Sequence, residues 1–128
     1  MSLNTSGFLR LNDENDIRTI ADRSHQEPVV IFKHSATCPV SAWARDQMSA
    51  FARETGRTVY EVVVQYARPV SNTIAERYGI RHESPQVIVL FQDRPQFHVS
   101  HRGITTGAVR DALRSSLTQE SAPFPASA

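Results

Sequence analysis

The most reactive side chain in this 128-residue chain is its only cysteine, Cys38. It follows the polar segment 33–37 and precedes Pro39, a residue suited to the first position of a helix. This order predicts that the thiol lies at a helix N-terminus, where unpaired backbone N–H groups and the helix dipole favour a negatively charged sulfur. We therefore expect Cys38 to be a nucleophilic thiol.

Several neighbours of Cys38 are expected to stabilise its thiolate form. They offer a hydroxyl group, a backbone N–H in the first helical turn, or an imidazole that carries positive charge when protonated. The predicted set consists of Thr37, Pro39, Val40, Ser41 and His34. His82 is a second histidine expected in a loop near the helix start, and ordinary loop hydrogen bonding is the alternative for either histidine.

A lone cysteine also has a purely structural interpretation, because free cysteine often behaves as a small buried apolar residue. In that case Cys38 would be sealed in the core, and its thiol would resist alkylation at neutral pH. The polar segment before Cys38 and the helix start after it favour the reactive interpretation.

The composition restricts the partners and the compartment. With 14 basic against 13 acidic residues the chain has almost no net charge, which disfavours a nucleic-acid-binding or anionic-membrane-binding surface. We recognise no pattern of a secretory signal or a membrane span, and a single cysteine cannot form an internal disulfide. We expect a protein of the reducing cytoplasm that acts on small molecules or proteins.

The histidines do not predict a metal centre. His98 and His101 lie three residues apart in a predicted strand, so they would face opposite sides of the sheet. A zinc site of the Cys-x-x-Cys type is excluded because the chain has one cysteine. We expect no bound metal and no tightly bound cofactor, since the Gly-rich nucleotide signatures are also missing from the sequence.

The elements around Cys38 alternate between strand and helix. The run 29–32 predicts a buried strand, and apolar residues at helical spacing predict a helix from Pro39 to about Gly56. A second strand at 58–64 completes a β-α-β unit with parallel strands. The other expected elements are a helix capped by Asn12 or Asp13, a helix after Pro69 capped by Ser71, a hairpin of strands 87–91 and 96–101, and a last helix capped by Thr105 or Thr106.

The order of these elements is α-β-α-β-α-β-β-α, which predicts an α/β fold. The simplest packing is a four-stranded mixed sheet with helices on both faces, preceded by an extra N-terminal helix. One domain at 8–118 accounts for the length of the chain, and we expect 1–7 and 119–128 to be flexible termini.

The order after the first helix resembles the thioredoxin-like fold. That fold places a cysteine at the N-terminus of the helix after its first strand, and a cis-proline just before the strand that starts its final hairpin. The matching positions are Cys38 and Pro85. By spacing alone Pro85 would be an ordinary trans proline at a strand edge, but the resemblance implies a cis Ser84–Pro85 bond.

Three segments resemble one branch of that fold, the monothiol bacilliredoxins, whose active-site motif is Thr-Cys-Pro-Ile-Ser. They are Lys-His-Ser-Ala-Thr-Cys-Pro-Val-Ser at 33–41, Arg-Pro-Val-Ser-Asn at 68–72 and Arg-His-Glu-Ser-Pro-Gln at 81–86. Val40 replaces the isoleucine of the motif, and both side chains are β-branched and apolar. The likeness extends over about residues 8–118.

This resemblance implies a thiol-disulfide oxidoreductase that removes the low-molecular-weight thiol bacillithiol from mixed disulfides on oxidised proteins. Cys38 would be the attacking thiolate, and bacillithiol would be a co-substrate. Ser41 occupies the position of the second cysteine in dithiol relatives, so regeneration would need a second bacillithiol and an external disulfide reductase. The expected partners are bacillithiolated client proteins, the small thiol and that reductase.

The resemblance also implies a substrate groove beside the thiol. A cis-proline would leave the backbone N–H and C=O of Ser84 free to pair with the substrate backbone. Bacillithiol carries carboxylates on its malate group, so Lys33 and Arg81 are candidates to bind it. The candidate groove residues are Ser84, Pro85, Lys33, Arg81 and His82. Trp43, one turn into the helix, either packs in the core or forms a stacking lid.

Three alternative functions were weighed against these residues. A glutaredoxin-like enzyme that uses glutathione or another thiol would share the fold and the chemistry. An iron–sulfur carrier is a weaker match, because monothiol glutaredoxins use Cys-Gly-Phe-Ser where this chain has Cys38-Pro39-Val40-Ser41. A non-catalytic thioredoxin-like binding module belongs to a different class, and it would have a buried Cys38.

Overall fold

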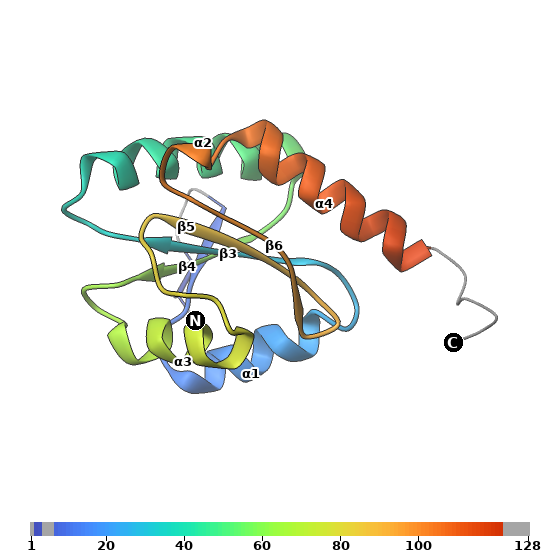
Figure 1. Cartoon of the computed structure of the whole chain (residues 1–128), viewed down its shortest axis with the longest axis horizontal. Helices are drawn as coiled ribbons and strands as arrows, with labels where there is room; N and C mark the ends of the chain where they lie inside the picture. Colours follow the sequence, from blue (N-terminus) through green and yellow to red (C-terminus); the bar gives the residue numbers. More distant parts are fainter. Residues whose placement is uncertain (1, 4–6, 122–128) are drawn as a thin grey trace.

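The computed structural model describes residues 2–3 and 7–121, and the side chains of residues 7–118. The chain alternates between strands and helices (Figure 1). The strands are β1 (Ser2–Leu3), β2 (Phe8–Arg10), β3 (Val29–His34), β4 (Val59–Val63), β5 (Gln86–Phe91) and β6 (Arg94–Ser100). The helices are α1 (Glu14–Arg23), α2 (Pro39–Thr55), α3 (Arg68–Tyr78) and α4 (Thr106–Ser121), with a 3₁₀ turn η1 (His101–Gly103).

In the described residues these strands form one mixed six-stranded sheet in the order β1-β2-β4-β3-β5-β6. The predicted strands β3 to β6 are confirmed, with β3 parallel to β4 and antiparallel to β5. The prediction of four strands is wrong, because β2 adds parallel to β4 and β1 adds antiparallel to β2. A three-residue strand is too short to show alternation, so only its pairing with β4 makes it a strand.

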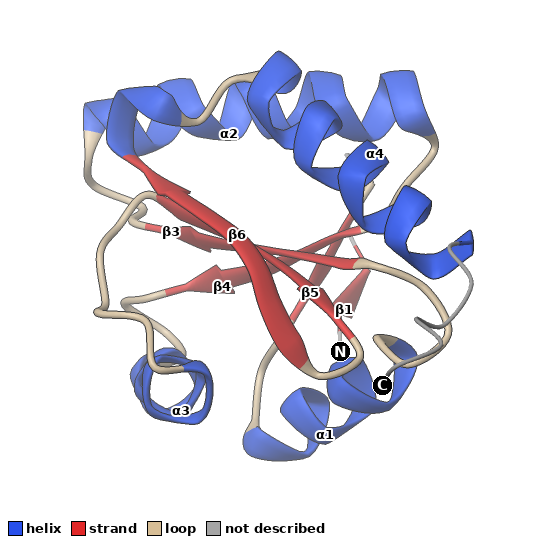
Figure 2. Ribbon diagram, turned by 45° about the vertical axis from the view of Figure 1, so that its right-hand side comes forward, coloured by secondary structure: helices blue, strands red, loops and turns tan. Residues whose placement is uncertain are grey.

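The helices cover both faces of the sheet, as expected. Figures 1 and 2 show α1 and α3 on one face and α2 and α4 on the other. The core on the first face includes Ile20, Ile31, Ile74 and Ile88, all fully buried. The core on the second face includes Phe8, Phe32, Met48, Phe51 and Val109, also fully buried. Two separate cores explain why β3 to β5 are apolar on both sides.

Local signals set most helix boundaries. Asp13 caps α1 in a capping box with Asp16, and Gly56 ends α2 in the left-handed conformation at φ 69°. The expected cap of α3 is wrong: the helix begins at Arg68 with Ala67 as its cap. Because Pro69 suits the first helical turn, the helix starts ahead of Ser71 and leaves that side chain buried inside the first turn.

The structure contradicts part of the prediction that residues 1–7 and 119–128 are flexible termini. Ser2 and Leu3 pair with β2, so these two residues are not a free terminus. At the other end, α4 continues to Ser121. Positions 1, 4–6 and 122–128 lie outside the described residues. Within the described ranges, none of the helices has the length and apolar character needed to span a bilayer.

Candidate active site

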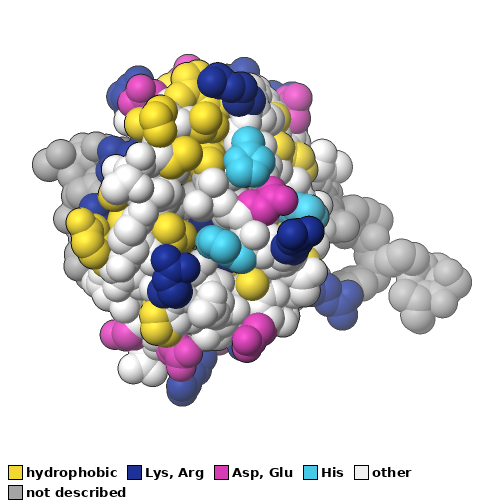
Figure 3. Space-filling view, turned by 60° about the vertical axis from the view of Figure 1, so that its left-hand side comes forward, with side chains coloured by type: hydrophobic (Ala, Val, Ile, Leu, Met, Phe, Trp, Pro, Cys, Tyr) yellow, Lys and Arg dark blue, Asp and Glu magenta, His cyan; other side chains and the backbone are white. Residues whose placement is uncertain are grey.

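Three chain segments meet at one edge of the sheet. The carboxyl ends of the parallel strands β3 and β4 lie side by side, with His34 opposite Val63. Because β5 is antiparallel to β3 and pairs Gln86 with Lys33, the residues before β5 reach the same edge. Figure 1 shows these connections on its left side, and Figure 3 looks onto that side, where histidine, basic and hydrophobic side chains lie close together.

Cys38 lies at this edge as the N-cap residue of α2. Its backbone is extended, at φ −99° and ψ 122°, and its carbonyl accepts the first helical hydrogen bond from Ala42 N at 3.0 Å. Pro39 is the first helical residue, as predicted. The thiol is half-buried and makes no capping hydrogen bond with the described residues, so it is neither sealed in the core nor used to close the helix.

Ser41 and His34 hold the loop before the thiol. The Ser41 hydroxyl is fully buried, accepts from Ser35 N at 2.8 Å and lies 3.0 Å from His34 Nδ1. The expectation that this hydroxyl bonds to the sulfur is therefore wrong. Burial also lowers the pKa of His34, so at neutral pH it is an uncharged imidazole rather than the expected cation.

Gln65, which the sequence analysis missed, clamps the same loop from the other side. Its Oε1 accepts from Ala36 N at 3.0 Å, and its Nε2 donates to Ser35 Oγ at 2.8 Å and to Thr37 Oγ1 at 3.5 Å. Thr37 is exposed, and its hydroxyl is bonded to Gln65 rather than to the sulfur. A polar residue two positions after a buried parallel strand was the available signal, because such strand ends meet at one edge.

The Ser84–Pro85 peptide bond is cis, as the resemblance implies. Pro85 O accepts from His101 N at 2.9 Å, which ties the start of β5 to η1. From the described part of the chain, no hydrogen bond reaches the backbone N–H or C=O of Ser84. These two groups are therefore available to pair with an extended chain, as in strand addition.

Lys33 does not border the groove as expected. Its side chain is fully buried on the α3 side of the sheet, where Nζ donates to Ser71 O at 3.0 Å and lies 3.3 Å from His82 Nδ1. Burial lowers the pKa of Lys33 to about 8. Of the predicted groove cations, Arg81 is exposed, and its carbonyl accepts from Gln86 Nε2 at 3.1 Å.

His82 is likewise uncharged at neutral pH. Burial of part of its ring, followed by the charges of Lys33 and Arg68, lowers its pKa. Its Nδ1 also lies 3.1 Å from Ser71 Oγ. The histidine therefore anchors the segment before Pro85 and does not supply a positive charge to the thiolate.

A buried acid, Glu61, is a second feature that the sequence analysis missed. It lies in β4 on the α2 side, fully buried, with Arg45 Nε at 2.9 Å from Oε2 and Arg10 Nε at 3.6 Å from Oε1. Two arginines balance its charge, so it ties β2 and α2 to the sheet. The alternation of side chains along β4 was the only signal in the sequence. It indicates that Glu61 is buried, but it does not identify the two arginines that pair with it.

Trp43 supports the packing alternative. Its ring is half-buried against the core under α2 and α4, and the Arg102 guanidinium lies 5.8 Å from the ring centroid. A partly covered ring with a cation over it is a normal way to seal the side of a helix. We therefore assign Trp43 to packing between α2 and η1.

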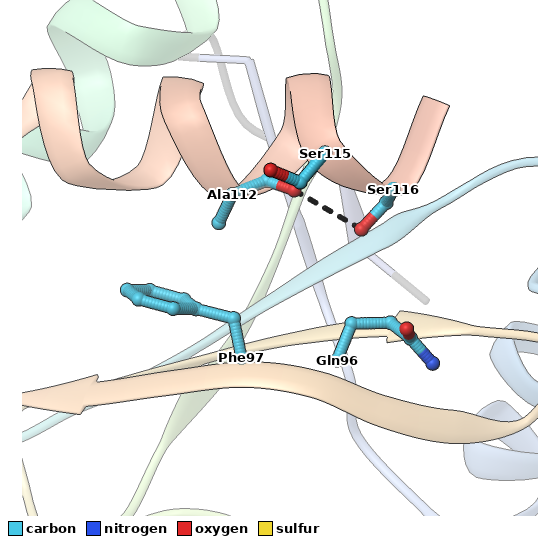
Figure 4. A pocket seen from close by; sticks show the side chains of 5 residues that line it. All are labelled: Gln96, Phe97, Ala112, Ser115 and Ser116. Carbon is cyan, nitrogen blue, oxygen red and sulfur yellow. Dashed lines mark hydrogen bonds between the residues drawn. The ribbon is translucent and has the colours of Figure 1, made fainter. Parts of the chain in front are cut away.

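A pocket of about 190 Å³ lies elsewhere, between β6 and α4 (Figure 4). Its lining residues are Gln96, Phe97, Ala112, Ser115 and Ser116. None of them belongs to the segments around the thiol or the cis-proline, so the pocket has no part in the chemistry of Cys38. Among the described residues, no group of three or more His, Cys, Asp or Glu side chains is placed to hold a metal ion.

Comparison with known proteins agrees with this geometry. A solved structure described as a candidate oxidoreductase with a thioredoxin fold is 28% identical, with a TM-score of 0.77 over 82% of this chain and 92% of the other. A thioredoxin from Trypanosoma brucei brucei is 15% identical, with a TM-score of 0.72 over 92% of this chain and 97% of the other. At that identity the second likeness shows the fold alone.

A third structure, a mutant thioredoxin from Halobacterium salinarum, has 15% identity and a TM-score of 0.66 over 98% of this chain and all of the other. These likenesses confirm the thioredoxin fold. The family model of the monothiol bacilliredoxin BrxC matches residues 9–109, which include Cys38, Gln65 and Pro85. The chain therefore belongs to the monothiol bacilliredoxin family and has the fold of thiol-disulfide redox proteins.

Proposed function

We propose that this protein removes bacillithiol from mixed disulfides on oxidised client proteins, with Cys38 as the attacking thiolate. The observation that carries the proposal is a half-buried sole thiol at the N-terminus of α2, at the same sheet edge as a cis Pro85. The neighbouring Ser84 has no backbone hydrogen bond to any described residue. A disulfide-bearing chain that pairs with Ser84 is brought to the edge that holds the sulfur.

The exchange proceeds in two displacements. The Cys38 thiolate attacks the bacillithiol sulfur of the client disulfide, so a new S–S bond forms on Cys38 while the client sulfur leaves as a thiolate and takes a proton from water. The thiolate of a second bacillithiol then attacks the Cys38 adduct. This step releases bacillithiol disulfide and restores the Cys38 thiolate, and an external reductase returns the disulfide to two thiols.

The chain supplies no resolving thiol, which supports the monothiol route. Ser41 stands where a dithiol enzyme has its second cysteine, and its hydroxyl is already bonded to Ser35 N. Because the cycle consumes a free small thiol, we place the protein in the cytoplasm, where such thiols are kept reduced.

The test follows the adduct by intact mass. A bacillithiolated client is incubated with the wild-type protein and with Cys38→Ala, and the masses of client and protein are recorded over time. We expect the adduct to leave the client and appear on the wild-type protein only. An adduct that stays on the client with both proteins would refute the proposal. Faster turnover of a glutathionylated client would reassign the small thiol to glutathione.

A further inference from the structure

Lys33 is the only lysine among 14 basic residues, and it is placed unlike the arginines around it. Lys33 is the next-to-last residue of β3, just before the thiol loop, and its side chain is fully buried. Among the side chains of residues 7–118, no carboxylate forms an ion pair with it. A buried ammonium without a counter-ion is costly, so its contacts need a reason beyond stability.

The contacts of Lys33 lead to the segment that enters β5. An ammonium has only donors, so Nζ donates to Ser71 O at 3.0 Å and to His82 Nδ1 at 3.3 Å. Nδ1 must therefore be unprotonated, which places the ring proton on Nε2. Ser71 Oγ, 3.1 Å away, is a second donor to the same nitrogen. His82 is thus held in one orientation from both β3 and α3.

His82 stands two positions before Ser84 in a segment without helix or strand. The segment is fastened at four points: Gln86 Nε2 donates to Arg81 O at 3.1 Å, Lys33 reaches His82, Glu83 Oε2 lies 3.5 Å from His101 Nε2, and His101 N donates to Pro85 O at 2.9 Å. Between these anchors the backbone groups of Ser84 have no partner in the described residues. The anchors therefore decide where those free groups point.

We propose that Lys33 is a positioning residue for the client: through His82 it holds the Ser84 backbone in the orientation that pairs with the substrate chain. This inference rests on the proposed function. Lys33 touches neither the sulfur nor the substrate, so it acts on binding and leaves the nucleophile unchanged. A purely structural lysine would instead stabilise the fold and affect every property together.

The test compares Lys33→Met, which keeps the length and removes the donor, with a control at the opposite end of the sheet. The control is Arg77→Met, which removes the hydrogen bond that Arg77 Nη2 donates to Asp93 Oδ2 at 2.6 Å. For Lys33→Met we expect KM for a bacillithiolated client to rise about tenfold, the effect of losing one charge-assisted hydrogen bond to a binding segment. We expect kcat and the rate of Cys38 alkylation by iodoacetamide to stay within about twofold, and the midpoint of thermal unfolding to stay equal or rise. Arg77→Met should leave KM unchanged.

Backbone ¹⁵N NMR order parameters at residues 82–84 give a readout that needs no activity. They should fall in Lys33→Met and in His82→Ala, and keep their wild-type values in Arg77→Met. Unchanged order parameters in Lys33→Met, or a loss of alkylation rate equal to the change in KM, would overturn the inference. A wild-type protein that leaves the client adduct intact would instead refute the proposed function, whatever the order parameters at 82–84 show.

Discussion

The two ends of the central sheet are held together by different kinds of polar contact. At the end opposite the thiol, the turn between β5 and β6 is fastened by Asp93, which accepts from Arg77 Nη2 at 2.6 Å and from Tyr78 OH at 2.7 Å. Its backbone N–H donates to Ser24 Oγ at 2.9 Å. Acid and base are matched there. At the thiol end, the buried cation Lys33 contacts only neutral acceptors among the described residues.

This difference indicates that one end of the sheet contributes to stability and the other to function. A matched, partly exposed pair locks a turn and has no free group to offer a ligand. In the described part of the chain, the thiol end has a half-buried sulfur, a Ser84 backbone without hydrogen bonds and a Lys33 ammonium without a counter-ion. Each of these favours binding or reaction over folding. Changes at the hairpin end, which is the end with the turn between β5 and β6, should therefore alter the free energy of unfolding. Changes at the thiol end should alter the rate of disulfide exchange.

The largest effect should come from Cys38→Ser. A hydroxyl is a far weaker nucleophile than a thiolate, so the rate of disulfide exchange should fall by at least about a thousandfold. The free energy of unfolding should change by less than about 0.5 kcal/mol, because the thiol makes no capping bond with the residues that the structure describes. A disulfide-exchange assay measures the rate, and urea unfolding measures the free energy of unfolding. A large loss of stability would show that the thiol end is also structural.

At the hairpin end, Asp93→Ala should lower the free energy of unfolding by about 2 kcal/mol, through the lost hydrogen bonds and the positive φ of this residue, 55°. Asp93→Asn, which tolerates that backbone, is the matched control and should lose about half as much. Urea unfolding measures both. The rate of disulfide exchange should equal that of the wild type. A lower rate would contradict the inference that the hairpin end affects stability alone.

The pH dependence of stability should reveal the unbalanced cation. Burial lowers the pKa of Lys33 to about 8 from 10.5, so between these values the unfolded chain binds more protons than the folded one. Stability should therefore rise with pH, by about 2 kcal/mol between pH 8 and 10 relative to Lys33→Met. Urea unfolding at each pH measures the difference. A flat difference would mean that Lys33 has a counter-ion in solution.

The smallest effect is expected for Gln65→Ala, which frees the loop at 35–37 from β4. The looser loop should slow both Cys38 alkylation and client exchange, by about fivefold, because both depend on how the sulfur is held. Gln26→Ala is the control, because Gln26 is an exposed glutamine in the turn before β3, at the opposite end of the sheet. Equal alkylation rates for Gln65→Ala and the wild type would remove Gln65 from the site.

Sequence patterns predicted the parts of this site that depend on neighbours along the chain. A strand, a polar segment, a cysteine and a proline in succession place Cys38 at a helix start, and the structure has it there. The same local rules found β3 to β6 and the four helices of the described residues. The roles of His34, Ser41 and Lys33 were misjudged, because each depends on contacts with residues distant in sequence or on burial that a strand pattern does not resolve.

The sequence by itself determined the single thiol, its place at the start of α2 and the family to which the chain belongs. Only the tertiary structure decided that Lys33 is buried against His82, that Gln65 and Ser41 hold the thiol loop, and that β2 extends the sheet. The physical reason is the distance along the sequence between the residues that interact. Helix caps and turns form between residues a few positions apart, whereas burial and hydrogen-bond partners are set by which strands and helices meet in space.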